Sequence, residues 1–170
     1  MRIYITGPAG SGKSTLAQQL WTHYDIPVVH LDELMWKPGL MESEEYRILQ
    51  AQEISKDVWI IEWSSVSILR LMAHRVDRVI ILNTPPIGNM LRIIMRFLKS
   101  FLWEKRVGFN STETQSFPFK LLLKTAIWRK KQLPRIRFNI QECSLWERVL
   151  EVHSIENVFE KIVTMIDLKK

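Results

Sequence analysis

Near its N-terminus the chain contains the sequence Gly7-Pro8-Ala9-Gly10-Ser11-Gly12-Lys13-Ser14-Thr15. An apolar run precedes it at residues 1–6, and a helix is predicted to begin near residue 13. The spacing of Gly, four residues, Gly-Lys and Ser is that of a P-loop, which needs a strand before it and a helix after it. We therefore predict a loop whose backbone N–H groups surround a phosphate.

All residues of this stretch, 7–15, are predicted to bind ATP. The glycines let successive N–H groups turn toward an anion, and the helix adds the positive end of its dipole. Lys13 would reach the β- and γ-phosphates, and the Ser14 hydroxyl would be a ligand of Mg²⁺. The alternative is a glycine-rich turn without a ligand.

The composition is that of one globular domain, because the 170 residues are 46% hydrophobic and 25% charged. A single cysteine, Cys143, excludes an intrachain disulfide and suits a reducing cytosol. The chain enters a strand directly, so we expect no signal peptide and a cytoplasmic protein. Its longest apolar stretch, 87–103, contains three basic residues and is a poor candidate for a transmembrane span.

The net charge of +6 is unevenly distributed. Residues 92–137 contain twelve Lys or Arg and two Glu, a net charge of +10. The rest of the chain contains twelve basic and sixteen acidic residues, a net charge of −4. Three interpretations stay open for the basic section: a solvated charged face, a clamp for polyphosphate, or a surface for nucleic acid.

Short apolar strands alternate with helices along the chain. Because most of these strands are apolar on both faces, we predict a parallel sheet with helices on each side. Strands are expected at 1–6, 28–33, 58–62, 78–82 and 149–152, and helices at 43–55, near 69–71, from 86 onward, and from a Ser154 cap to about 168. Residues 103–119 have the weakest pattern and are predicted to form a long mobile loop, as lids often do.

Two acidic residues, Asp32 and Glu62, follow predicted strands. The ends of parallel strands share one edge with the P-loop, which suggests Mg²⁺-dependent phosphoryl transfer. Glu62 would hold the metal through water, or it is a surface acid that ends a strand. Asp32 would accept a proton from a substrate hydroxyl or orient the substrate or the waters of the metal, or it caps the next turn.

Basic side chains complete the donor side of the predicted site. Arg92, Arg96 and Lys99 recur on one helix face and suit a triphosphate, because a guanidinium binds phosphate oxygens in pairs. One of these side chains, or Arg106 or Arg129, would stabilise charge in the transition state. The alternative for each of them is a solvated basic face.

Tryptophans are frequent, with seven in the chain. Trp36 and Trp63 come after the two acid-ended strands and are candidates to line an acceptor pocket, with core packing as the alternative. Three others are expected to pack in the core or under helices: Trp59, Trp128 and Trp146.

Several segments resemble the bacterial adenylate-kinase-like P-loop proteins, and in particular the group of topology modulation proteins. The resemblance covers nearly the whole chain and is carried by 1–15, His30-Leu31-Asp32, Trp36, 59–62 and 77–82. It implies a P-loop NTPase α/β fold of three layers, α/β/α, with a five-stranded parallel sheet of order 2-3-1-4-5. It also implies a single domain, 1–170, with a small helical lid at about 100–130.

The resemblance also implies roles for individual residues. Asp32 matches the acid after the second strand, and Arg92 and Arg96 match the lid-side arginines. The residues that match the ATP and Mg²⁺ loop are Gly7, Gly10, Gly12, Lys13 and Ser14. The predicted catalytic residues are therefore Lys13, Asp32, Arg92 and Arg96. A departure follows the third strand, where the family has Asp-Gly-Asn-Tyr and this chain has Glu62-Trp63-Ser64-Ser65.

The leading hypothesis is an ATP- and Mg²⁺-dependent kinase for a small molecule that resembles a nucleoside or a nucleotide. Its acceptor would lie between Asp32, Trp36, Glu62 and Trp63. One alternative is an NTPase that associates with nucleic acid through residues 92–137. The other is a nucleotide-binding regulator without turnover, which the departure at Glu62-Trp63 favours.

Overall fold

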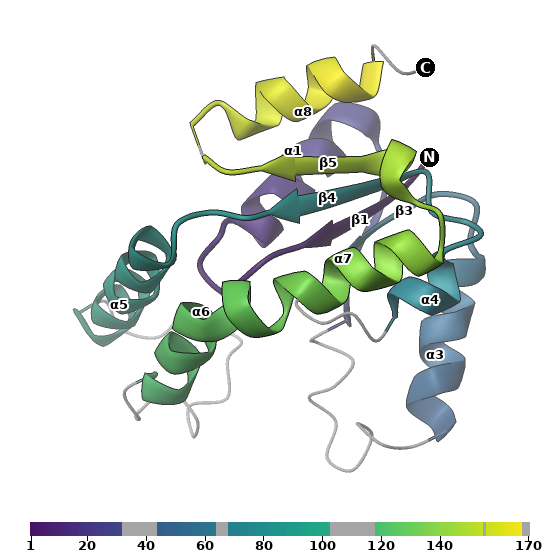
Figure 1. The fold of residues 1–170 in the computed structure, drawn as a ribbon. Helices are drawn as coiled ribbons and strands as arrows, with labels where there is room; N and C mark the ends of the chain where they lie inside the picture. Colours follow the sequence, from purple (N-terminus) through teal and green to yellow (C-terminus); the bar gives the residue numbers. More distant parts are fainter. Residues whose placement is uncertain (32–43, 64–67, 103–117, 155, 168–170) are drawn as a thin grey trace.

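The computed structural model describes residues 1–31, 44–63, 68–102, 118–154 and 156–167. These segments form a five-stranded parallel sheet between two layers of helices (Figure 1). The strand order is β2-β3-β1-β4-β5, as predicted. The strands are β1 (Arg2–Thr6), β2 (Val28–His30), β3 (Trp59–Glu62), β4 (Arg78–Leu82) and β5 (Val149–Val152).

Strand β1 is the central strand and pairs with β3 on one side and β4 on the other. Both of its faces are covered by helices, so the side chains on both faces must be compatible with burial. Ile3, Tyr4 and Ile5 are fully buried. The P-loop follows β1 directly, so it begins in the middle of the carboxyl edge of the sheet.

One face of the sheet is covered by α1 (Lys13–Tyr24) and α8 (Val158–Asp167). Alternate residues of the strands supply the sheet side of this core, because successive side chains point to opposite faces. The core contains Ile3, Ile5, Leu16, Ala17, Leu20, Ile26, Ile60, Ile80, Leu82, Leu150, Val152, Ile162 and Ile166.

The opposite face is covered by α3 (Glu44–Ser55), α4 (Leu69–Met72), α6 (Phe119–Lys131) and α7 (Leu133–Glu142). Trp59 and Trp128 belong to this second core, as predicted. Trp59 is fully buried, and its indole N–H donates to the backbone oxygen of Ile54 at 3.2 Å.

Helices α5 (Pro86–Leu102) and α6 lie side by side at the end to which the arrowheads of β4 and β5 point (Figure 1). The prolines at 85 and 86 suit the start of α5, where a backbone N–H has no partner within the helix. Across the described segments, no helix is both long enough and apolar enough to cross a membrane.

Three predictions about local structure are wrong. Strand β2 ends at His30, and Leu31 already has helical conformation. Helix α8 begins at Val158, four residues after the predicted Ser154 cap, and Ser154 Oγ accepts the N–H of Glu156 before the helix. Trp146, expected in the core, is 47% exposed, since it lies in a surface 3₁₀ turn, η1 (Trp146–Arg148).

Candidate functional site

The P-loop leaves β1 and enters α1 at Lys13 through two residues with left-handed backbone conformation. The φ angle is 73° at Gly10 and 90° at Gly12. A Cβ on Gly12 would meet no heavy atom within 4 Å, so the backbone borders open space at this turn. The first N–H groups of α1 have no partner within the helix and point to the loop side, which makes this end of α1 a site for an anion.

Two polar residues inside the loop are buried, Ser11 and Lys13. Lys13 Nζ donates to the backbone oxygen of Pro8 at 3.1 Å, so the ammonium group folds back over the loop. Ser11 Oγ is buried and has no hydrogen-bond partner in the described part of the chain. A buried hydroxyl without a partner is rare, and a ligand oxygen at the loop would satisfy it. The loop therefore fits the phosphates of a nucleotide.

The structure brings Ser14 and Glu62 together, as their predicted roles require. Ser14 Oγ donates to Glu62 Oε1 at 3.0 Å. Glu62 is the last residue of β3 and lies opposite Ile5 of β1, so its carboxylate is next to the start of α1. Glu62 is buried, with 6% of its surface exposed. Hydroxyl and carboxylate oxygens are the ligands that Mg²⁺ prefers.

Helix α5 is hydrogen-bonded to the P-loop through Asn89 and Arg92. Arg92 Nε donates to the backbone oxygen of Gly10 at 2.6 Å, and Arg92 Nη2 donates to Asn89 Oδ1 at 2.5 Å. Asn89 is fully buried and also accepts from the Thr84 hydroxyl at 2.8 Å. Burial lowers the pKa of the Arg92 guanidinium. Arg92 thus binds the backbone of the P-loop, next to the candidate phosphate site.

Arg129, a further candidate for the transition state, binds the end of β4. Its guanidinium donates to Asn83 Oδ1 at 2.8 Å and to the backbone oxygen of Asn83 at 2.7 Å. Asn83 Nδ2 in turn donates to Glu151 Oε1 at 2.7 Å, and Arg137 donates to the same carboxylate at 2.8 Å. Three arginines of the basic section, 92, 129 and 137, thus make hydrogen bonds to other elements of the fold.

Sequence reasoning missed Asn83 and Asn89. Their positions in the chain could have indicated them. Asn83 and Asn89 come after the carboxyl end of β4, and ligands of parallel sheets bind at that edge. Among the predicted residues, Arg96 is exposed on α5, whereas Trp63 is 7% exposed and belongs to the second core. Asp32, Trp36 and Arg106 lie outside the described residues, as does most of the predicted loop and lid, 103–117.

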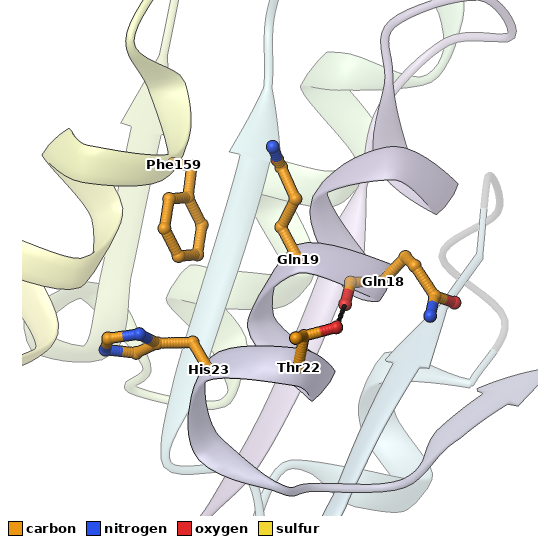
Figure 2. A pocket seen from close by; sticks show the side chains of 5 residues that line it. All are labelled: Gln18, Gln19, Thr22, His23 and Phe159. Atoms are coloured by element: carbon orange, nitrogen blue, oxygen red, sulfur yellow. Dashed lines mark hydrogen bonds between the residues drawn. The ribbon is translucent and has the colours of Figure 1, made fainter.

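A cavity of about 360 Å³ adjoins the P-loop. The loop and α1 form one wall, Arg92 contributes from α5, and residues 157–160 at the start of α8 form the other wall. A neighbouring hollow of about 380 Å³ lies between α1 and α8 (Figure 2). It shares Gln19 and Phe159 with the first cavity, and the rings of His23 and Phe159 meet edge to face, 5.5 Å between centroids.

No protein-family model matches the chain, and no curated protein matches it. Solved structures with a similar fold exist. A shikimate kinase from Acinetobacter baumannii in complex with shikimate has a TM-score of 0.64 at 18% identity, over 99% of this chain and 94% of that chain. An uncharacterised protein from Eubacterium ventriosum has a TM-score of 0.56 at 15% identity, over 98% of each chain.

A shikimate kinase from Aquifex aeolicus has a TM-score of 0.51 at 18% identity, over 99% of this chain and 98% of that chain. Similarity at this level of identity concerns the fold. The chain has the P-loop α/β fold, with a five-stranded parallel sheet, that shikimate kinases and adenylate-kinase-like proteins share.

Proposed function

We propose that the protein is an ATP-dependent kinase that phosphorylates a hydroxyl group of a small molecule. The observation that carries this proposal is the Ser14–Glu62 hydrogen bond at the mouth of the P-loop. It joins a nucleotide loop to a buried carboxylate on the neighbouring strand, an arrangement that suits a Mg²⁺-bound triphosphate. The similarity of the fold to two shikimate kinases supports a kinase.

The donor side of the proposed site uses residues whose positions are described. Lys13 and the N–H groups at the start of α1 would bind the phosphates, and the cavity beside the loop would hold the nucleoside. Within the described ranges, no group of three or more His, Cys, Asp or Glu side chains is suited to hold a metal alone. Mg²⁺ at Ser14 and Glu62 would therefore need oxygens of the nucleotide and of water, and it would neutralise phosphate charge there.

The residues proposed to bind the phosphate acceptor come from the sequence. In the proposed reaction an acceptor oxygen forms a bond to the γ-phosphorus, the bond to ADP breaks, and the hydroxyl proton passes to a base. Asp32 is proposed as that base or as an orienting group, with Trp36 and Glu62 beside the acceptor. Trp63 is not proposed as an acceptor contact, because it packs in the second core. We propose a nucleoside- or nucleotide-like acceptor, and membership of the topology modulation group as the finer assignment.

Calorimetry with ATP and Mg²⁺ tests the donor site. Lys13→Ala is expected to weaken ATP binding about 10- to 100-fold, because hydrogen bonds to charged groups contribute about 1.5–3 kcal/mol. Lys56→Ala is the matched control, since Lys56 is exposed and its ammonium pairs with Glu53 at 2.6 Å. If Lys13→Ala and wild type bound ATP with equal affinity, the proposal that the P-loop binds ATP would be wrong.

A transfer assay tests the kinase proposal itself. The protein and labelled ATP are incubated with panels of nucleosides, nucleotides and small alcohols, shikimate among them. Transfer of label to at least one acceptor, lost in Lys13→Ala, is the expected result. Tight ATP binding without transfer to any of these acceptors would instead identify a nucleotide-binding regulator.

A further inference from the structure

Helix α5 presents a row of large apolar side chains to solvent. Ile87, Leu91, Met95 and Leu98 are 75%, 56%, 54% and 46% exposed. Their spacing of four, four and three residues places them on one face of the helix. An isolated exposed leucine is ordinary, but a contiguous row on one helix face marks a surface that contacts something else.

Basic residues lie beside this row. Lys99 follows Met95 by four residues, so it is displaced from Met95 by about 40° around the helix axis. Arg96 is also exposed on this side of α5, whereas Arg92 turns back to the P-loop. No acidic residue occurs anywhere in α5. The helix is therefore apolar on one strip of its exposed surface and positive on the next.

Helix α6 repeats this arrangement. Phe119 and Leu123 are 67% and 54% exposed and lie one turn apart. Lys120 and Lys124 are exposed next to them, and α6 also lacks acidic residues. Helices α5 and α6 are in contact and lie side by side at one end of the sheet (Figure 1), so their apolar and basic side chains lie at the same end of the molecule.

We propose that this region, the α5–α6 surface, binds the surface of an anionic lipid bilayer. It consists of Ile87, Leu91, Met95, Leu98, Lys99, Phe119, Lys120, Leu123 and Lys124. Apolar side chains of such a helix enter the boundary between headgroups and acyl chains, and neighbouring lysines pair with anionic headgroups. This contact would be peripheral, and it is independent of the proposed kinase activity.

Two other occupants fit the surface less well. A second copy of the chain would bring two positive surfaces together, and like charges across an interface oppose binding. A nucleic acid would use the lysines but gives no role to an exposed row of aliphatic side chains, since phosphate contacts dominate its affinity. The combination of an apolar row with basic neighbours is complementary to an anionic bilayer.

Co-sedimentation with vesicles tests the proposal on the full chain. Vesicles of phosphatidylcholine with phosphatidylglycerol are expected to bind the protein, and vesicles of phosphatidylcholine alone to bind it weakly. Leu91→Ser combined with Met95→Ser should reduce partitioning at least about tenfold, because apolar burial is lost. Lys99→Gln and Lys124→Gln should each reduce partitioning about fivefold and weaken its dependence on salt, because one of the basic residues is lost.

Ile48→Ser is the matched control, because Ile48 is 52% exposed on α3, away from this surface. Ile48→Ser and Lys13→Ala should both bind anionic vesicles like wild type, and circular dichroism checks that every variant is folded. Failure to bind anionic vesicles, or undiminished binding by the Leu91→Ser, Met95→Ser variant, would overturn the proposal. So would a lipid-free dimer in ultracentrifugation that this variant abolishes, since the occupant would then be a second copy.

Discussion

Ser14 of the P-loop donates a 3.0 Å hydrogen bond to Glu62 at the end of β3, although 48 residues separate them. Parallel pairing of β1 with β3 produces this contact, because it aligns Ile5 with Glu62 just before the loop begins. The side chain of Glu62 reaches the loop hydroxyl. Glu62 therefore places a carboxylate beside Ser14, where the proposed Mg²⁺ would bind.

The contribution of this pair to metal binding can be measured from the effect of Mg²⁺ on ATP affinity. In Ser14→Ala, the affinity for ATP with Mg²⁺ should fall about 10- to 100-fold, toward the affinity measured with a chelator, because a metal ligand is lost. Glu62→Gln should show the same trend. Ser55→Ala is the control, since Ser55 Oγ only donates to the backbone oxygen of Gln52 on exposed α3. An undiminished effect of Mg²⁺ in Ser14→Ala would contradict the assignment.

Alanine substitutions at two glycines near the loop should change the free energy of unfolding in opposite directions. A Cβ at Gly10 would lie 2.4 Å from the backbone oxygen of Asn89, and φ there is positive. Gly10→Ala should therefore lower the free energy of unfolding by at least about 2 kcal/mol. A Cβ at Gly88 in α5 would lie 3.6 Å from its nearest neighbour, an ordinary contact. Gly88→Ala should therefore raise the free energy of unfolding by about 0.5–1 kcal/mol. Urea denaturation measures both, and a tolerated Gly10→Ala would refute the close approach of α5.

Asn89 is expected to position the P-loop through Arg92. Asn89→Ala removes the acceptor of both Thr84 Oγ1 and Arg92 Nη2 and should cost about 1–3 kcal/mol of stability. Arg92 then loses the group that orients it toward the Gly10 carbonyl, so ATP affinity should also fall. Calorimetry on the folded variant separates these effects. Loss of stability with unchanged ATP affinity would limit Asn89 to a structural role.

The α/β class was predictable from local patterns. Strands such as 78–82 are apolar on both faces, which requires helices above and below the sheet. The strand order was implied by the resemblance to adenylate-kinase-like proteins and is the order observed. The donor site followed from the same logic. Gly7 to Thr15 lies between a strand and a helix, and Glu62 ends the neighbouring strand.

The partners of the arginines were not predictable. Arg92 binds Gly10 across 82 residues, and Arg129 binds Asn83 across 46 residues, so packing of the helices decides these contacts. Helical spacing gave the face of α5 on which Arg92 lies but not its partner. Trp146 was misassigned for a related reason, since its large apolar area favoured the core and a short surface turn holds it outside.

Stability at acid pH should depend on a contact between Arg2 and Asp77. Arg2 donates to the Asp77 carboxylate from its backbone N–H at 2.7 Å and from its guanidinium at 3.0 Å and 3.3 Å. Burial by itself raises the pKa of Asp77, but the hydrogen bonds from Arg2 outweigh it, and the net pKa is lower than usual. The contact ties the start of β1 to the residue before β4.

The sign of this dependence follows from proton linkage. A carboxyl group with a lowered folded-state pKa stabilises the fold above its unfolded pKa of about 3.9, and this stabilisation disappears as the pH falls through the folded-state value. Because the Asp77 side chain is 36% exposed, solvent screening limits the contribution to about 1 kcal/mol. Asp77→Asn should therefore be less stable than wild type by that amount at pH 7 in urea denaturation. The difference should shrink once the pH falls below about 3.9, and a difference that does not shrink on further acidification would show that the charge of Asp77 is not its source.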